Sequence, residues 1–363
     1  MKISALIAEG IRNLKPLQLV PRERFNVFVG DNGQGKTNLL ETIYVVASLR
    51  SFRTAKLADL VVFGATEAKI GVRVEREGMT RVYEIALAPG SRVVRLDGKA
   101  VKPLAKYFGG FNVVVFTPED LNLARGSPSD RRRFLDRSAF NLRPDYLALA
   151  QDYDKVLRQR NAVLRQAEGL PRARTDALLA VYDEQLAPLA VAMMAARREL
   201  LTALHGELEA AFAAITHTQL RVAARYVARA RGTTVEEILV ELAEGRARDL
   251  ATQSTHIGPH RDDLALELDG RDAGLFASQG QLRAIMLAWK SAELTMLGRA
   301  HGDLPILLLD DVSSELDPQR NEYLFQHLAT LAGQCFITTT HGDHVLLRQH
   351  RADYRISAGQ ILE

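Results

Sequence analysis

The spacing of apolar residues changes twice along the chain. In the first 122 residues apolar and polar positions alternate, as at 70–75 and 82–87, and this period of two predicts β-strands. Two mainly apolar runs, 25–29 and 111–116, predict buried strands. Asp97 and Gly98 separate two strand-like stretches and predict a hairpin turn. The first third of the chain is therefore expected to be rich in β-structure.

From about residue 129 to 216, apolar residues recur at every third or fourth position, which predicts amphipathic helices. Gly169–Pro171 interrupts this pattern, as expected where one helix ends and another begins. We therefore expect an antiparallel pair of helices. A helix of about 25 residues extends only ~37 Å at 1.5 Å per residue, so the pair is expected to form a short arm.

Strand and helix patterns return after Gly258. We expect strands at 264–268, 305–310 and 334–338, and an amphipathic helix that begins near Gln281. The sequence thus predicts one discontinuous α/β domain, formed by residues 1–122 and 255–363. A helical arm of residues 123–254 interrupts that domain.

The apolar run at 25–29 leads directly into a glycine-rich segment. Its residues are Gly30, Asp31, Asn32, Gly33, Gln34, Gly35, Lys36 and Thr37, and Asn38 continues into a helical pattern. The segment fits the P-loop motif G-x-x-x-x-G-K-[ST] in its required context of a strand before and a helix after. Backbone N–H groups in such a loop bind phosphate. Lys36 is expected to reach the β- and γ-phosphates of ATP, and the Thr37 hydroxyl to ligate Mg²⁺.

Two aspartates follow the apolar strand at 305–310. Asp310 ends that strand and Asp311 comes next, so both are expected at its C-terminal edge. Two acids after a strand are common by themselves, but together with a P-loop they predict a nucleotide site. Asp310 is expected to hold Mg²⁺, directly or through water, and Asp311 to polarise the attacking water.

A short segment before the predicted helix at 281 resembles the L-S-G-G-Q signature of ABC ATPases. Ser278, Gly280 and Gln281 match the signature, whereas Ala277 and Gln279 depart from it. In that superfamily the signature contacts the γ-phosphate bound by the opposite subunit. By itself the segment is equally consistent with a helix N-cap, and its position before the 305–310 strand favours the signature.

Three further segments belong to the same comparison. Ser313–Asp317 resembles the D-loop, which contacts the partner subunit. Thr338–His341 ends with a candidate switch histidine, His341, which on its own is also consistent with an ordinary surface histidine. The usual Q-loop glutamine is not evident, and Phe116–Asp120 occupies its expected place.

Composition narrows the class of protein. The chain has 363 residues, 47% hydrophobic and 25% charged, as expected of a globular protein with about two domains. Cys335 is the single cysteine and cannot form an internal disulfide, which is consistent with a reducing, cytoplasmic compartment. We see no secretory signal and no stretch close to the ~20 apolar residues of a membrane span, so no membrane association is expected.

The net charge of +3 does not by itself indicate a nucleic-acid binder. Residues 1–122 carry 18 Lys and Arg against 12 Asp and Glu, whereas residues 255–363 carry 9 against 15. A basic front half is compatible with contacts to a phosphate backbone, and a solvated arginine-rich surface would give the same counts.

The motifs together resemble the RecF family over almost the whole chain. The resemblance is carried by the P-loop, Ser51–Thr54 and Val114–Asp120, and by the more distinctive segments Gly126–Asp136, Gly258–Asp263 and Asp310–Asp317. It implies an α/β, ABC-type P-loop ATPase head with an inserted short antiparallel helical arm. RecF-like chains also resemble this one in carrying aspartate where most ABC proteins have glutamate, here Asp311, and we therefore expect slow, DNA-stimulated ATP hydrolysis.

The resemblance implies a role in DNA repair and the SOS response. ATP and Mg²⁺ would drive head-to-head homodimerisation and binding to double-stranded, gapped and single-stranded DNA, with RecR and RecO as partners in recombinase loading. Arg131–Arg133 is a candidate for DNA contact or a charge cluster on a helix face. The alternative is the ATPase subunit of an ABC transporter. A P-loop kinase would leave Ser278–Gln281 and His341 without a role.

Overall fold

The computed structural model describes residues 1–362 except 55, 103, 312–315 and 332. The chain divides into two compact units. Unit 1 comprises residues 1–122, 214–217 and 283–363, and unit 2 comprises residues 123–213 and 218–282. The later boundary thus lies at 282 and not at the expected 254, because strand β10 (Asp263–Leu268) pairs along its length with β9 (Val222–Val227). The functional assignment of these domains stays a prediction.

Unit 1 contains an antiparallel sheet of six strands in the order β2-β1-β4-β5-β6-β7. Its strands are β1 (Lys2–Glu9), β2 (Leu17–Leu19), β4 (Ala68–Arg76), β5 (Met79–Ala88), β6 (Ser91–Leu96) and β7 (Lys99–Ala100). Asp97 and Gly98 form the turn between β6 and β7 with positive φ angles, as their sequence predicts.

The second sheet of unit 1 has the order β15-β14-β3-β13-β12-β8. All neighbours are parallel except β14 and β15. Its strands are β3 (Phe25–Val29), β8 (Val113–Phe116), β12 (Ile306–Asp310), β13 (Cys335–Thr339), β14 (Arg351–Ser357) and β15 (Gln360–Leu362). The mainly apolar runs are thus confirmed as buried strands of a parallel sheet.

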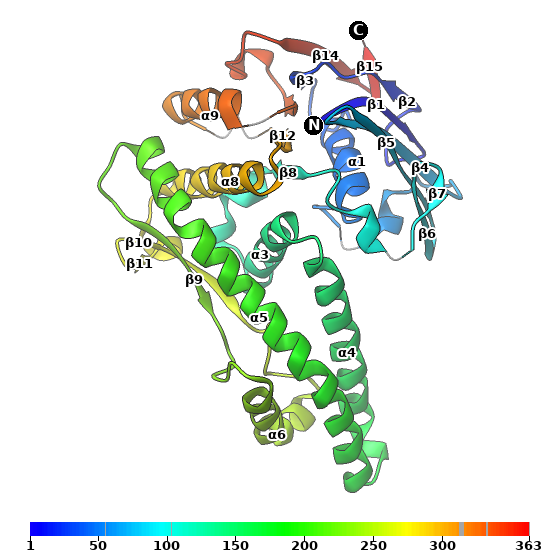
Figure 1. The fold of residues 1–363 in the computed structure, drawn as a ribbon, viewed down its shortest axis with the longest axis vertical. Helices are drawn as coiled ribbons and strands as arrows, with labels where there is room; N and C mark the ends of the chain where they lie inside the picture. The colour runs from blue at the N-terminus through cyan, green and yellow to red at the C-terminus, as the bar shows by residue number, and fades with distance from the viewer. Residues whose placement is uncertain (55, 103, 312–315, 332, 363) are drawn as a thin grey trace. The chain divides into compact units, whose positions relative to one another are not determined.

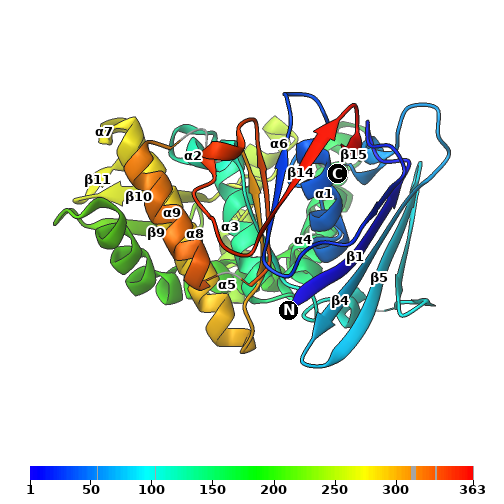
Figure 2. The ribbon, with the colours of Figure 1, turned by 90° about the horizontal axis from the view of Figure 1, so that it is seen from above.

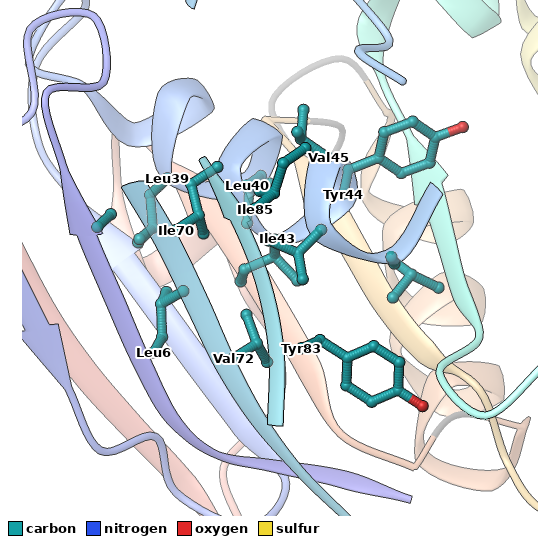
Figure 3. Close-up of a cluster of buried hydrophobic side chains, with 14 of the residues drawn as sticks. Leu6, Leu39, Leu40, Ile43, Tyr44, Val45, Ile70, Val72, Tyr83 and Ile85 are labelled. Atoms are coloured by element: carbon teal, nitrogen blue, oxygen red, sulfur yellow. The ribbon is translucent and has the colours of Figure 1, made fainter. Parts of the chain in front are cut away.

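Helix α1 (Lys36–Ser48) packs between the two sheets of unit 1, and the antiparallel sheet curves along one side of it (Figure 2). Leu39, Leu40 and Ile43 of α1 meet Ile70 and Val72 of β4 in one buried cluster (Figure 3). Because α1 is fixed by apolar contacts on both sides, its N-terminus has a defined position at the end of β3.

The remaining helices of unit 1 are shorter or lie toward the C-terminus. Among the described residues they are the 3₁₀ helices η1 (Leu57–Leu60), η2 (Leu104–Tyr107) and η6 (Gly342–His344), and the α-helices α2 (Pro118–Leu121), α8 (Gln279–His301) and α9 (Pro318–Leu331). Helix α8 begins at Gln279, close to the expected start, and its first four residues belong to unit 2.

Unit 2 is mainly helical, with a three-stranded sheet in the order β11-β10-β9 (Figure 1). Besides β9 and β10 it contains β11 (Arg271–Asp272), η3 (Leu123–Arg125), α3 (Pro128–Leu142), α4 (Tyr146–Gln166), η4 (Ala167–Gly169), α5 (Arg172–Thr216), α6 (Val235–Thr252) and α7 (Ala273–Phe276). The last three residues of α5 belong to unit 1. Helices α4 and α5 lie side by side, as the interrupted apolar pattern predicts.

The expected length of about 25 residues is wrong for α5, which has 45 residues and therefore extends roughly 67 Å. Pro188 lies inside α5 without ending it. Apolar side chains before and after it, including Leu186, Met193 and Leu204, are buried. Packing along the whole helix outweighs the local cost of the proline.

Helix α5 is also long and apolar enough to cross a membrane by length and composition alone, with an 18-residue window of mean hydropathy 1.3. This window contradicts the expectation that no stretch of the chain approaches the apolar length of a membrane span. Asp183 and Arg197 on the same helix are buried and form ion pairs within unit 2. We therefore interpret α5 as the core helix of unit 2.

Candidate nucleotide-binding site

The glycine-rich loop joins β3 to α1 at the C-terminal edge of the parallel sheet. Gly33 and Gly35 have φ angles of 81° and 107°, which favour glycine. A side chain at Gly30 would overlap the carbonyl oxygen of Ile356 on β14. The glycine spacing of the motif therefore has a steric basis in this fold.

The Lys36 side chain is folded back over the loop. Its Nζ donates to the carbonyl oxygens of Gly30 and Asp31 at 2.6 and 2.9 Å. Burial lowers the pKa of Lys36, while the carboxylates of Asp311, Asp310 and Asp31 act in the opposite direction. The ammonium group thus lies in the part of unit 1 where negative charge collects.

Thr37 and Asp310 lie in direct contact although they are 273 residues apart. The Thr37 hydroxyl donates to Oδ1 of Asp310 at 2.8 Å, and the Thr338 hydroxyl donates to the same oxygen at 2.8 Å. Burial raises the pKa of Asp310, the two hydroxyl donors lower it, and Glu119 and Asp311 raise it further. The structure brings the two expected Mg²⁺ ligands together at the ends of α1 and β12.

Asp311 follows Asp310 in a left-handed conformation with φ of 48°. Its backbone N–H donates to the carbonyl oxygen of Thr338 at 3.1 Å, which fixes it against the end of β13. Glu119 of α2, in the segment expected to replace the Q-loop, is close enough to influence Asp310 electrostatically. Three carboxylates therefore converge on this edge of the sheet.

His341 follows β13 at the same edge and is exposed. Its backbone N–H donates to the Thr339 hydroxyl at 3.2 Å, and its ring packs edge-on against His344 with 5.3 Å between centroids. The side chain of Asn321 on α9 donates to the carbonyl oxygen of His344 at 2.8 Å, so this loop is tied to α9. Its role as a γ-phosphate switch stays a prediction.

Residues far from the motif support the phosphate loop from outside. The Asn13 amide donates to the Gly33 carbonyl oxygen at 2.8 Å, and the Asn38 amide donates to Asn13 Oδ1 at 2.6 Å. The N–H of Gly359 donates to the Gln34 carbonyl oxygen at 3.0 Å. The loop is thus held by segments from both ends of the chain.

The donors at this edge fit a nucleoside triphosphate with Mg²⁺. Among the described residues, no side chain forms a capping hydrogen bond at the N-terminus of α1, whose N-cap is Gly35. An uncapped helix N-terminus beside a lysine is a binding site for phosphate. A threonine hydroxyl and an aspartate provide the oxygen ligands that Mg²⁺ prefers. Nucleotide binding by the individual residues stays a prediction.

The expected signature residues lie in unit 2, at the start of α8. The Ser278 hydroxyl accepts from the Gln281 N–H at 3.2 Å, and the Gln281 side chain accepts from the Ser278 N–H at 2.8 Å. Gly280 lies in the first helical turn between them. The segment therefore is an N-terminal cap, and Ser278 is exposed. Of the expected D-loop, Ser313 to Glu315 lie outside the described residues.

The arginine triplet Arg131–Arg133 separates into three different environments. Arg131 forms a bidentate ion pair with Asp263 at 2.8 and 2.7 Å. Arg132 donates to the carbonyl oxygen of Asp262, and Arg133 pairs with Asp130 of its own helix. The triplet is thus not a uniform charged face.

The Gly258–Asp263 segment is a structural element of unit 2. The His260 ring contacts the Tyr153 hydroxyl through Nδ1 at 2.6 Å and the Thr255 carbonyl oxygen through Nε2 at 2.9 Å. Gly258 has φ of 124°, and a side chain there would lie against the same tyrosine hydroxyl. This packing explains why a glycine and a histidine occur together in the motif.

Sequence reasoning missed Asn13, Glu119 and Gly359 as parts of the nucleotide site. The turn before β15 has an Ala358-Gly359 pair that suggests a hairpin, but nothing in it indicates contact with Gln34. Asn13 follows Arg12 and is not part of a recognisable motif. The contact of Gly359 with Gln34 depends on the pairing of β14 with β3, whereas Asn13 reaches the site from the loop between β1 and β2 and Glu119 from α2.

Comparisons with known proteins agree with this geometry. A family model described as the RecF/RecN/SMC N terminal domain matches residues 2–358. The chain is 40% identical to the DNA replication and repair protein RecF of Myxococcus xanthus (strain DK1622), with 97% of this chain and 94% of the relative covered. It is 43% identical to the protein of that name from Anaeromyxobacter sp. (strain Fw109-5), with 94% and 92% covered.

Solved structures give the same result. The recombination mediator protein RecF-ATPrS in the RecFOR pathway aligns with a TM-score of 0.87 and 30% identity, over 99% of this chain and 97% of that one. An Smc head bound to the C-winged helix domain of ScpA aligns with a TM-score of 0.55 at 14% identity, over 100% of this chain and 98% of that one, and shows a shared fold. These matches support the repair protein and not the alternative of a transporter subunit. The chain belongs to the RecF family of DNA replication and repair proteins.

Proposed function

We propose that this chain is an ATP-dependent DNA-binding protein of recombinational repair, which dimerises head to head when ATP is bound. The observation that carries the proposal is the contact between Thr37 and Asp310, beside Lys36 and the uncapped N-terminus of α1. The similarity to RecF structures solved with ATP and ATPrS supports the choice of nucleotide.

Each site residue has a distinct proposed role. The loop Gly30–Asn38 would surround the phosphates, with Lys36 turning from the loop carbonyls to the β- and γ-phosphates. Thr37 and Asp310 would hold Mg²⁺, which neutralises charge on the phosphates. Asp311 would position water, and His341 would respond to the γ-phosphate.

The second copy of the chain would complete the site with Ser278, Gly280 and Gln281. The exposed Ser278 hydroxyl and the first turn of α8 are suitable donors for a γ-phosphate. Because these contacts would require the terminal phosphate, ATP would favour the dimer and ADP would not. The difference in affinity between the two nucleotide states would make the protein a switch.

Slow hydrolysis would suit this switch. The side chain of Asp311 is one methylene shorter than the glutamate of most ABC ATPases, so water would be held less closely. DNA would stimulate this weak activity by stabilising the closed dimer. Binding of double-stranded, gapped and single-stranded DNA, partnership with RecR and RecO, and a cytoplasmic location are parts of the same proposal. The RecFOR pathway of the related structures supports the partnership.

Sedimentation velocity with and without ATP tests the dimer. The wild type should shift from monomer to dimer in ATP with Mg²⁺, Lys36→Met should stay monomeric, and Asp311→Asn should remain dimeric for longer. Lys99→Met on the exposed strand β7 is the matched control and should behave as wild type. A wild type that stays monomeric in saturating ATP would refute the model.

A gel shift on gapped and intact duplex, with ATP, ADP or no nucleotide, tests the DNA part of the proposal. We expect retention in ATP that weakens as salt concentration rises, because contacts to phosphates release counterions. DNA binding that is equal in ATP and ADP would contradict a nucleotide-gated function.

A further inference from the structure

Unit 2 contains an open cavity of about 590 Å³ lined by four arginines. Arg132 lies on α3, Arg229 follows β9, Arg248 lies on α6 and Arg261 lies in the Gly258–Asp263 segment. The lining also includes Ser127 and Ser129 at the start of α3, and no carboxylate is among its described residues. Four separate segments thus bring positive charge to one place.

The four arginines are not neutralised by ion pairs among the described residues. Arg132 donates to the Asp262 carbonyl oxygen at 2.8 Å, and Arg261 donates to the Thr255 carbonyl oxygen and the Ser254 hydroxyl at 3.0 and 2.7 Å. These uncharged acceptors orient the guanidinium groups but do not neutralise the positive charge of the guanidinium groups. The exposed side chains of Arg229 and Arg248 have no hydrogen bond or ion pair within the described part of the chain.

The acidic side chains around the cavity already have other partners. Asp130 accepts from Ser127 and pairs with Arg133, Asp263 pairs with Arg131, and Asp262 accepts from the Tyr226 hydroxyl and the Arg229 N–H. Asp249 pairs with Arg160 and with His256, a further residue of the lining. The cavity therefore keeps a surplus of positive charge, which an anion would relieve.

We propose that this cavity binds phosphates of the DNA backbone and so gives unit 2 a direct contact with DNA. This inference rests on the proposed function, because it assumes that the chain binds DNA. Guanidinium groups hold phosphate oxygens through paired N–H donors. Of the lining residues that the structure describes, only Pro128 is apolar, whereas the core of a protein interface is typically apolar. The observations therefore favour a nucleic-acid backbone over an acidic protein.

The test uses full-length Arg229→Ala/Arg248→Ala protein, because both side chains are exposed and their loss should not unfold the chain. The matched control is Arg158→Ala/Arg165→Ala, which removes two exposed arginines of α4 in the same unit. We expect affinity for duplex DNA to fall about tenfold or more in the cavity variant and to stay close to wild type in the control. The dependence of affinity on salt should also become shallower in the cavity variant.

The outcomes separate this inference from the proposed function. If wild type does not bind DNA in ATP, the proposed function fails. If wild type binds and the cavity variant equals the control, the inference is overturned. If the cavity variant keeps DNA binding but loses binding to a protein partner, the inference is overturned. The occupant of the cavity would then be an acidic protein.

A further arm distinguishes DNA phosphate from a small anion. Inorganic phosphate at constant ionic strength should compete with DNA for binding to the wild-type protein. Phosphate should also raise the melting temperature of the cavity variant less than that of wild type. Stabilisation by phosphate without a loss of DNA affinity in the variant would identify a small-anion site and overturn the inference. ATP-dependent dimerisation should be the same in wild type, variant and control, which checks that the fold and the nucleotide site are intact.

Discussion

Gly35 has a backbone φ of 107°, and a side chain there would lie 3.0 Å from a methyl group of Leu14 and 3.1 Å from Asn13 Oδ1. The P-loop motif predicts Lys36 and Thr37 from sequence because its residues are adjacent and their roles are local. Asp310 could be predicted because it ends an apolar strand. Asn13 could not, because its contact depends on the path of a loop between β1 and β2.

His260 provides a residue-scale prediction about pH. Burial lowers its pKa from 6.5 to about 4, so the folded state favours the neutral ring. As pH falls below 6.5 the unfolded chain binds a proton first, and stability is lost progressively until about pH 4, by about 3 kcal/mol in total. Above pH 6.5 this group makes no contribution to the pH dependence.

Urea unfolding at pH 7.5 and 4.5 measures this effect. His260→Gln should be less sensitive to acid than wild type, whereas His205→Gln, which changes an exposed histidine on α5, should keep the wild-type dependence. Equal acid sensitivity in wild type and His260→Gln would show that the buried ring is not responsible.

At the scale of elements, α4, α5 and α6 are joined by buried ion pairs. Arg160 of α4 donates to Asp183 of α5 and Asp249 of α6 at 2.7 Å each, and Arg246 of α6 also donates to Asp183, at 2.8 Å. Apolar spacing predicts α4 and α5 because it is a local property. It cannot show which charged residue faces inward. The apolar pattern itself continues to residue 216, past Pro188, so the expected length of about 25 residues is shorter than the pattern.

Arg160→Met should destabilise unit 2 by about 3–5 kcal/mol, because it leaves two buried carboxylates without their shared arginine. Arg172→Met is the control. It removes an exposed pair with Asp176 one helical turn away and should cost below about 1 kcal/mol. Thermal unfolding of both variants against wild type measures the difference, and equal losses would mean that the buried network adds no special stability.

At the scale of the whole molecule, unit 1 is assembled from both ends of the sequence. The sequence patterns predict this discontinuity, because the P-loop and the strand that ends at Asp310 must belong to one site. They place the second boundary at 254, since the strand at 264–268 carries no sign of its partner. Pairing with β9 assigns that strand to unit 2.

The contact between the C-terminal hairpin and the phosphate loop gives a prediction at this scale. Gly359 has φ of 78°, and a side chain there would overlap the Asn13 carbonyl oxygen, so Gly359→Ala should displace the turn that supports Gln34 and weaken ATP binding. Gly270→Ala is matched, because Gly270 has φ of 74° with open space around it. Calorimetric titration with ATP should show weaker binding for Gly359→Ala than for wild type and Gly270→Ala. Equal ATP affinities of the three proteins would show that the hairpin does not support the phosphate loop.

The same arrangement constrains how the protein is made. Strand β3 is translated more than 300 residues before its two neighbours β13 and β14. Until these strands are translated, the nascent chain carries an apolar strand without its partners. The phosphate loop that follows this strand also lacks its contact with the C-terminal hairpin. Nucleotide capture should accordingly be a post-translational event. Ribosome-stalled chains that end near residue 340 should fail to retain an ATP photoaffinity label, and labelling of such chains would show that the loop matures without its C-terminal partners.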